Sequence, residues 1–90
     1  MSTAVRIVKT ADVLHGKPRI EGTRVGVFQI GEAVRRQDWS EGDAAEQFGL
    51  DVAQVRAAVE YYDEHPELMD TLRKQKRARR QSIRAESRAK

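Results

Sequence analysis

The stretch AAEQFGLDVAQVRAA, residues 44–58, decides the fold, because it has the pattern of two helices that cross at a tight turn. Ala45 is small where the helices would approach most closely, and Gly49 stands at a turn that often needs a positive φ. The residues expected to pack between the two helices are Phe48, Leu50, Val55 and Ala58. The pattern predicts a helix-turn-helix, although the same spacing also occurs in trihelical cores that serve only for dimerisation.

Capping residues and apolar spacing predict further helices around this turn. Ser40 is the expected N-cap of the first helix, and Asp51 is the expected N-cap of a second helix that runs through Tyr62. The inner face of the second helix is expected to contain Val52, Val55, Ala58, Val59 and Tyr62. An earlier helix is predicted over residues 27–37, and Pro66 suits the first turn of a later one.

The N-terminal part of the chain predicts short strands and turns. Residues 5–8 are β-branched and alternate weakly, which favours a strand. Gly16, Pro18 and Gly22 interrupt the next stretch, where a second short strand is expected over residues 19–21. Taken together, the segments predict a mainly α fold: a homeodomain-like or winged helix-turn-helix with a short N-terminal β arm and a C-terminal helix or tail.

Charge is divided unevenly along the chain. Residues 1–70 contain eight Lys and Arg against thirteen Asp and Glu, whereas residues 71–90 contain nine Lys and Arg against Glu86 alone. A basic block of this density is typical of an interaction arm, because its charges repel one another and it has little apolar surface to bury. The sequence therefore predicts a helix-turn-helix domain over residues 1–65 and a basic C-terminal helix and tail over residues 66–90, disordered when free. A solvated tail with no specific role has the same composition.

Composition argues against several classes of protein. There is no cysteine among the 90 residues, and His15 and His65 are too few to form a metal site, so neither a disulfide nor a metal is expected. Gly16-Lys17-Pro18 lacks the preceding glycine and the following Ser or Thr of a phosphate-binding loop. No apolar run is long enough for a membrane span or a secretory signal. The sequence predicts a cytoplasmic protein that is not an enzyme and uses no cofactor or small-molecule substrate.

The second helix of the pair carries few side chains suited to reading bases. Gln54 and Arg56 could reach a base edge or a phosphate, whereas Asp51 and Glu60 would repel the DNA backbone. Cations elsewhere would then supply most of the affinity through phosphate contacts. The candidate DNA-binding residues are Lys17, Arg19, Arg24, Arg35, Arg36, Gln54 and Arg56. Alternatively, these cations pair with nearby carboxylates at the surface.

Two glycine-containing motifs are similar to those of a known family. The motifs and the spacing that follows them are GKPRI at residues 16–20, GTRV at residues 22–25, Phe48-Gly49-Leu50, Val55-Arg56-Ala57-Ala58 and Tyr61-Tyr62. Over about residues 5–65 the chain resembles domain of unknown function 433, a prokaryotic family of small VapB-type antitoxin-like proteins. One departure is Gly26, where the family usually has proline. The resemblance implies a homodimeric helix-turn-helix protein that is usually the partner of a PIN-like ribonuclease toxin.

The resemblance and the charge division together favour an antitoxin of a type II toxin-antitoxin system. Its dimeric N-terminal domain would bind operator DNA, and its tail would fold onto the toxin. Nuclease sites of the PIN class are lined by carboxylates that hold divalent metal, and arginine binds carboxylates in bidentate fashion. The candidate toxin-binding residues are Leu68, Met69, Leu72 and Ile83 as apolar anchors, with Arg73, Arg77, Arg80 and Arg84 as charge partners.

Two other functions remain open on the sequence alone. One is a stand-alone DNA-binding transcriptional regulator whose basic tail contacts phosphates and for which no toxin exists. The other is a dimerisation module with an incidental basic tail. Tail truncation would lower DNA affinity and its salt dependence in the first case, whereas the second predicts no DNA binding at about physiological salt.

Overall fold

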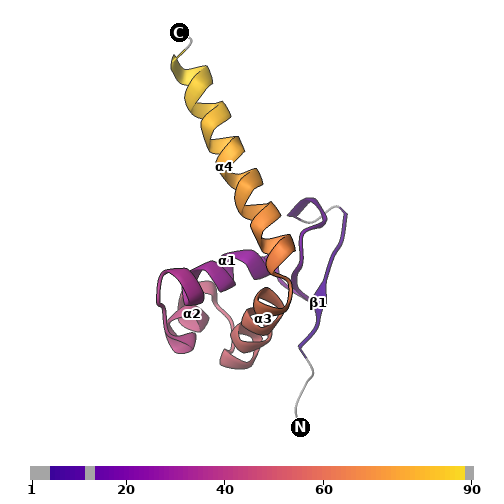
Figure 1. The fold of residues 1–90 in the computed structure, drawn as a ribbon. Helices are drawn as coiled ribbons and strands as arrows, with labels where there is room; N and C mark the ends of the chain where they lie inside the picture. The colour runs from indigo at the N-terminus through magenta and orange to yellow at the C-terminus, as the bar shows by residue number, and fades with distance from the viewer. Residues whose placement is uncertain (1–4, 12–13, 89–90) are drawn as a thin grey trace.

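The computed structural model describes residues 5–11 and 14–88, and the side chains of these residues as far as Arg80, with the exception of His15. Its elements in chain order are β1 (Ile7–Val8), the 3-10 helix η1 (Leu14–Gly16), β2 (Arg19–Ile20), α1 (Val27–Gly31), the π-helix η2 (Glu32–Arg36), α2 (Glu41–Phe48), α3 (Val52–Glu64) and α4 (Pro66–Arg88). The helices α1 to α3 form a cluster, β1 lies at one side, and α4 extends away from it (Figure 1). A mainly helical fold with a short N-terminal β arm is thus confirmed.

The N-terminal arm is a two-stranded antiparallel sheet followed by a turn. β1 pairs with β2 so that Ile7 lies opposite Ile20 and Val8 lies opposite Arg19. After β2 the chain reverses, and the amide of Ile20 donates to the carbonyl of Val25 at 3.2 Å. Ile20 is buried in the core, so it holds the arm against the helices. We call the arm together with α1, η2, α2 and α3 the body.

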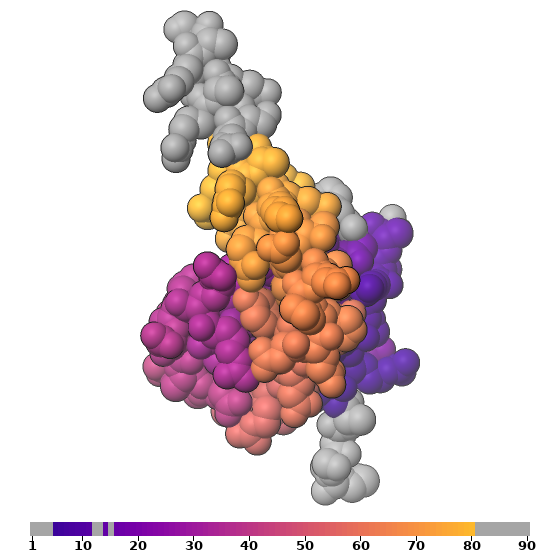
Figure 2. Space-filling view, viewed as in Figure 1, coloured from indigo at the N-terminus to yellow at the C-terminus, as the bar shows by residue number. Residues whose placement is uncertain are grey.

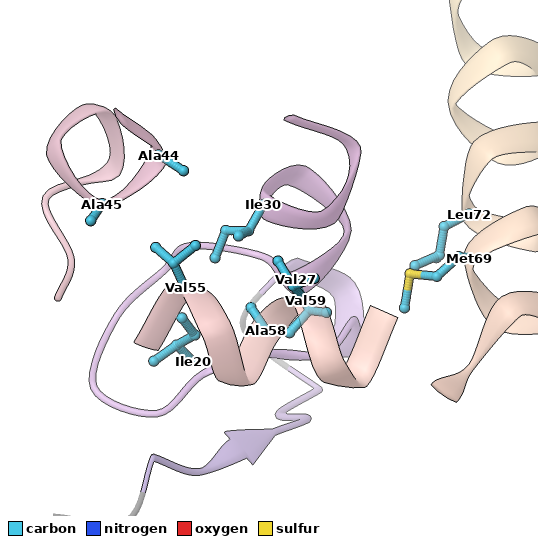
Figure 3. Packing of buried hydrophobic residues seen from close by; sticks show 10 residues of the cluster. All are labelled: Ile20, Val27, Ile30, Ala44, Ala45, Val55, Ala58, Val59, Met69 and Leu72. Atoms are coloured by element: carbon cyan, nitrogen blue, oxygen red, sulfur yellow. The ribbon is translucent and has the colours of Figure 1, made fainter. Parts of the chain in front are cut away.

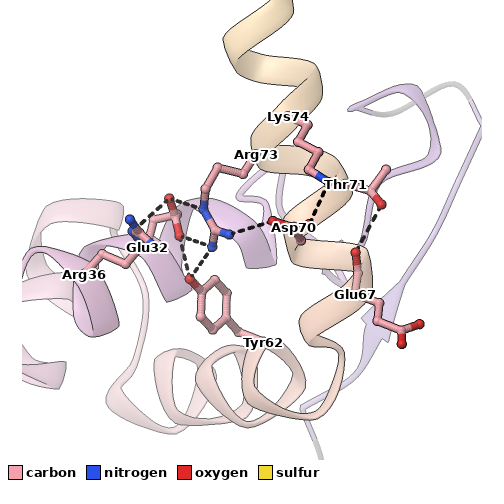
Figure 4. A network of polar contacts seen from close by, with 8 residues as sticks. All are labelled: Glu32, Arg36, Tyr62, Glu67, Asp70, Thr71, Arg73 and Lys74. Atoms are coloured by element: carbon pink, nitrogen blue, oxygen red, sulfur yellow. Dashed lines mark hydrogen bonds and ion pairs between the residues drawn. The ribbon is translucent and has the colours of Figure 1, made fainter.

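The helix expected over residues 27–37 is present, but its hydrogen bonding changes halfway. α1 is α-helical to Gly31, and η2 then has wider turns, such as the bond from the amide of Gln37 to the carbonyl of Glu32 at 3.1 Å. A Cβ added at Gly31 would overlap the ring of Tyr62, so this glycine lets α3 approach closely. π-helical turns inside helices are frequent at functional sites. Here the wider turn begins at Glu32, whose side chain faces α3 and α4 (Figure 4).

A tight turn joins α2 to α3, as the sequence predicts. Oγ of Ser40 accepts a hydrogen bond from the amide of Asp43 at 3.0 Å, which makes Ser40 the N-cap of α2. Gly49 ends α2 with a φ of 69°, a left-handed conformation that glycine adopts without a Cβ clash. The amide of Leu50 donates to the carbonyl of Ala45 at 2.8 Å, so this carbonyl in the last turn of α2 has a hydrogen-bond partner. These contacts fix the short connection between the two helices.

The core lies among α1, α2 and α3 and receives two side chains from α4 (Figure 3). Its buried residues are Ile20, Val27, Ile30, Ala44, Ala45, Val55, Ala58, Val59, Met69 and Leu72. Burial of such side chains is the main favourable contribution to folding. Because Met69 and Leu72 belong to α4, the core continues past residue 65 into this helix.

The prediction that Val52 lies on the inner face of α3 is wrong. Val52 is 38% exposed, whereas Val55 and Val59 on the same helix are buried. Val52 has the right helical phase but occupies the first turn of α3. Apolar periodicity predicts which face of a helix is apolar. It does not predict whether a neighbouring element covers every turn of that face. The helix also continues two residues past its expected end, to Glu64.

α4 is one helix of 23 residues that begins at the expected position, Pro66. A helix of this length measures about 35 Å. Its buried residues, Met69 and Leu72, lie in the first two turns, and beyond them the helix extends away from α1, α2 and α3 (Figures 1 and 2). That residues 66–90 are disordered in the free chain stays a prediction. No helix in the part of the chain that the structure describes is long and apolar enough to cross a membrane.

Candidate functional site

A polar network around Glu32 fixes α4 to the body (Figure 4). Glu32 lies at the start of η2, Tyr62 on α3 and Arg73 on α4. Nη2 of Arg73 donates to Oε2 of Glu32 at 2.8 Å and to the hydroxyl oxygen of Tyr62 at 2.9 Å, while that hydroxyl donates to the same carboxylate. The side chains of Arg73 and Glu32 are 23% and 19% exposed, so solvent screens this pair less than a surface pair. The network therefore sets where α4 crosses the body.

The same network shifts the ionisation of its members. Burial raises the pKa of Glu32, but hydrogen bonds from Arg73 and Tyr62 and the charges of Arg73 and Arg36 outweigh burial, so the pKa lies below its ordinary value. Burial raises the pKa of the Tyr62 hydroxyl, and its hydrogen bond to Glu32 raises it further. At neutral pH Glu32 is ionised and Tyr62 is protonated, and these are the states in which the network is complete.

Two of the arginines expected to contact DNA form bidentate ion pairs within the body. Nη2 of Arg35 lies 2.7 Å from Oδ2 of Asp63, and its Nε donates to the other carboxylate oxygen at 3.2 Å. Nη2 of Arg56 lies 2.9 Å from Oε1 of Glu41, and its Nε also contacts this carboxylate. The two pairs link η2 to α3 and α2 to α3. They agree with the alternative given above, in which these cations pair with nearby carboxylates at the surface.

Arg36, Gln54 and Arg19 also have partners within the chain. Nε of Arg36 lies 4.0 Å from the carboxylate of Glu32. Oε1 of Gln54 accepts from the amide of the N-cap residue of α3 at 2.8 Å, so this side chain helps to begin the helix. Nη1 of Arg19 donates to the carbonyl of Thr23 at 2.9 Å and stabilises the turn of the arm. Base or phosphate contact by these groups would compete with the bonds they already make.

The surface of α2 and α3 is acidic. Residues 41–64 contain seven Asp and Glu against Arg56 alone. Asp43, Glu46, Asp51 and Glu60 are exposed on this surface. A DNA duplex that approached it would meet repulsion between phosphates and carboxylates. The two helices are therefore unsuited by charge to bind DNA unaided.

The two remaining candidates, Lys17 and Arg24, lie beside α4 in a hollow of about 570 Å³ between the arm and the helix. The lining residues from the arm and α1 are Leu14, Lys17, Pro18, Arg24, Gly26, Phe28 and Gln29, and those from α4 are Leu72, Lys76 and Arg79. Nζ of Lys76 lies 6.0 Å from the centre of the Phe28 ring, within reach of a cation–π contact. The hollow thus combines apolar side chains with cations from the arm and from α4.

A second hollow of about 480 Å³ adjoins the first along α4. Both are lined by Lys17, Pro18, Leu72 and Arg79, and the second adds Lys9, Gly16, Leu68 and Gln75. We call the two together the cationic groove. Its basic residues are Lys9, Lys17, Arg24, Lys76 and Arg79, and none of them forms an ion pair with a described residue. No Asp or Glu is among the described residues that line it.

The candidate toxin-binding residues divide into four groups. Met69 and Leu72 are 1% and 6% exposed in the chain's own core, and Arg73 is held by Glu32, so these three are engaged within the chain. Arg77 and Arg80 are exposed on α4. Leu68 is partly buried against the core. The side chains of Ile83 and Arg84 lie outside the described residues.

Sequence reasoning missed Phe28, Lys76 and Arg79 as members of a site. The signal for the two cations is their spacing from Leu72, because residues four and seven positions further along a helix lie on the same face. No comparable signal exists for Phe28, which reaches the groove only through the crossing of α1 and α4. Among the described residues there is also no group of three His, Asp or Glu side chains placed to hold a metal ion.

Comparison with known proteins identifies the family of this chain but no individual relative. No curated protein and no solved structure matches it. One family model matches residues 7–62, which include the arm and nearly all of α1 to α3. α4 and therefore one wall of the cationic groove lie beyond the matched region. Because the match covers more than half of the chain, the chain belongs to the DUF433 family, described as proteins of unknown function.

Proposed function

We propose that this chain is the antitoxin of a type II toxin-antitoxin system and that α4 neutralises a PIN-like ribonuclease toxin. The observation that carries this proposal is the uneven pairing of charges. The body's arginines Arg35 and Arg56 are paired with its own carboxylates, whereas Arg77 and Arg80 are exposed on α4 without an ion pair to any described residue. α4 thus presents unpaired positive charge to a partner, whereas the arginines of η2 and α3 are paired with carboxylates of the chain.

The geometry of α4 suits a carboxylate-lined partner. Arg77 and Arg80 are three residues apart, so their guanidinium groups leave neighbouring positions on one helix face. Each guanidinium can bind a carboxylate through two parallel hydrogen bonds. The Glu32–Arg73 contact anchors the start of α4, so the helix loses less freedom on binding than an unattached segment does. A metal-binding nuclease site offers carboxylates of this kind.

The remaining parts of the proposal concern the body. α2 and α3 act as a helix-turn-helix of the homeodomain-like or winged kind, and the chain works as a homodimer that binds operator DNA in the cytoplasm. The left-handed Gly49 and the close contact of Leu50 with Ala45 support the helix-turn-helix assignment. The acidic surface of α2 and α3 means that unpaired cations elsewhere have to supply the phosphate contacts.

The antitoxin proposal predicts a small PIN-like nuclease in an adjacent reading frame, and co-expression of that nuclease with this chain tests the proposal. A chain that ends at Gln75 retains the buried Met69 and Leu72 and the Glu32–Arg73 pair, but it lacks seven Lys and Arg. We expect the full chain to restore growth and the truncated chain not to do so. Arg77→Ala/Arg80→Ala should weaken rescue strongly. Arg6→Ala/Arg36→Ala removes the same charge from exposed, loosely paired positions of the body and should leave rescue intact. Rescue by the truncated chain would contradict the proposal.

A stand-alone DNA-binding regulator is the second candidate function. It is favoured by the gathering of unpaired cations from the arm and α4 along one groove. In that case truncation after Gln75 should weaken binding to duplex DNA and reduce the slope of log affinity against log salt, because each lost phosphate contact lowers that slope by about one. An unchanged slope, measured by mobility shift over a salt series, would exclude a phosphate-binding role for α4.

A further inference from the structure

The cationic groove is elongated along α4. Its two hollows share four lining residues and together extend from Leu68 to Arg79. Eleven helical steps of 1.5 Å make this stretch about 16 Å long. An extended peptide advances about 3.3 Å per residue, so the groove has room for about five residues of extended chain. Its shape therefore matches a strand-like segment better than a compact small molecule.

The chemistry of the groove is that of an amphipathic acceptor. Lys17 and Arg24 approach from the arm, and Lys76 and Arg79 approach from α4. The same groove is lined by apolar side chains; they are Leu14, Pro18, Phe28, Leu68 and Leu72. Cations on both sides favour a ligand with negative charge along both edges, and the apolar base favours one large hydrophobic side chain between the charges.

We propose that the cationic groove binds an extended acidic peptide segment that carries one apolar anchor residue. The anchor lies against Leu14 and Phe28, and acidic residues on either side of it pair with the cations of the arm and α4. If the proposed function is correct, and the identification of the partner rests on it, this segment belongs to the toxin. The chain would then hold its partner at two places, the groove and the protruding part of α4.

Duplex DNA fits this groove less well than a peptide does. Phosphates lie on the outside of a duplex, so DNA would contact the cations at the rim and leave the apolar base uncovered. The base includes Leu14 and Phe28, which are only partly buried. A peptide side chain can reach these groups, whereas a phosphate gains nothing from them. Dependence of binding on an apolar anchor therefore separates the two ligands.

Fluorescence anisotropy with synthetic probes tests the proposal on the full chain at about 0.1 M salt. The main probe is a labelled five-residue peptide with a central leucine and two glutamates on each side, and its control has serine at the centre. We expect the leucine peptide to bind at least about tenfold more tightly, because a buried leucine contributes about 1.5–3 kcal/mol, which converts to a factor of ten or more. A labelled duplex serves as the nucleic-acid probe.

Matched charge reversals locate the binding site. Lys17→Glu/Arg24→Glu should weaken leucine-peptide binding at least about tenfold, since both rows of cations are needed. Arg6→Glu/Lys74→Glu changes the net charge equally, on exposed residues of the arm and α4 that do not line the groove, and should weaken leucine-peptide binding by less than about threefold. Thermal melting by circular dichroism confirms that each variant is folded.

Each outcome either supports or overturns the groove as an acidic-peptide site. Equal binding of the two peptides, equal loss in the two double variants, or no binding at all would overturn it. Tight duplex binding that depends on Lys17 and Arg24 but not on an anchor would show a phosphate site instead. The assay contains no toxin, so expected peptide binding together with failed nuclease neutralisation would refute the proposed function while the peptide site stands.

Discussion

Gly31 shows at the scale of one residue how α3 is placed. It is buried where α1 passes into η2, and the ring of Tyr62 occupies the space that a Cβ would need. The Tyr62 ring cannot move freely, because its hydroxyl is bound by Glu32 and Arg73. The absence of a side chain at this position therefore determines how closely α1 and α3 approach.

Gly31→Ala should lower the free energy of unfolding by about 1–3 kcal/mol, the usual cost of overpacking a core. Urea denaturation measures this change. Gly42→Ala is the control, since a Cβ at Gly42 in α2 meets nothing within 4 Å and alanine favours helix; its free energy of unfolding should stay unchanged or rise by up to about 1 kcal/mol. Equal effects of the two substitutions would contradict the role assigned to Gly31.

Gly26 is expected to accept proline. Its φ of −79° lies within the range of proline, and an added Cβ would meet Leu14, Gln29 and Pro18 at ordinary contact distances. The amide of Gly26 makes one long hydrogen bond, to Gln29 at 3.3 Å. Gly26→Pro should raise the free energy of unfolding by about 0.4–1 kcal/mol, because it restricts the unfolded chain. A lower midpoint of thermal unfolding would show that the lost hydrogen bond matters more than this restriction.

At the scale of elements, the network of Glu32, Tyr62 and Arg73 joins η2, α3 and α4 (Figure 4). Capping and periodicity, which are local properties, predict α3 and the start of α4. These properties do not predict the contact between the three side chains, which are 11 to 41 residues apart in the sequence. Pairing over such separations depends on where the helices cross.

Glu32→Gln should lower the free energy of unfolding by about 1–3 kcal/mol at neutral pH, since it weakens hydrogen bonds to a charged group. The pKa of Glu32 is depressed in the folded state, so the stabilisation is present above the ordinary value of 4.5 and is lost as pH falls through the folded value. The difference between the two chains should therefore narrow below about pH 4.5. Urea denaturation at several pH values measures this difference in the free energy of unfolding. A difference that does not change with pH would contradict the ion pair of Glu32 as its source.

At the scale of the whole molecule, the core crosses the expected boundary at residue 65. Met69 and Leu72 of α4 are buried with the side chains of α1 and α3, so part of the basic C-terminal segment is structural. The C-terminal segment differs from the body in charge, but the first two turns of this segment pack into the core of the body. We therefore expect the functional division to fall after these turns rather than before them.

A chain ending at Gln75 should unfold with nearly the same free energy as the full chain. A chain ending at His65 should lose several kcal/mol and be largely unfolded, because loss of each large buried side chain costs about 2–5 kcal/mol against a total of about 5–15. Urea denaturation of the full chain and of the two truncated chains measures these free energies of unfolding. A folded chain ending at His65 would restore the boundary expected from the sequence.

The sequence by itself determined the helices, the Gly49 turn, the short β arm and the division of charge, because caps, periodicity and composition act over a few neighbouring residues. Only the tertiary structure decided that Arg35 and Arg56 are paired and that Lys17 and Arg24 lie beside Lys76 and Arg79. The physical reason is that ion pairing and groove formation depend on distances between elements remote in sequence. These distances follow from the packing of Gly31, Tyr62 and the first turns of α4.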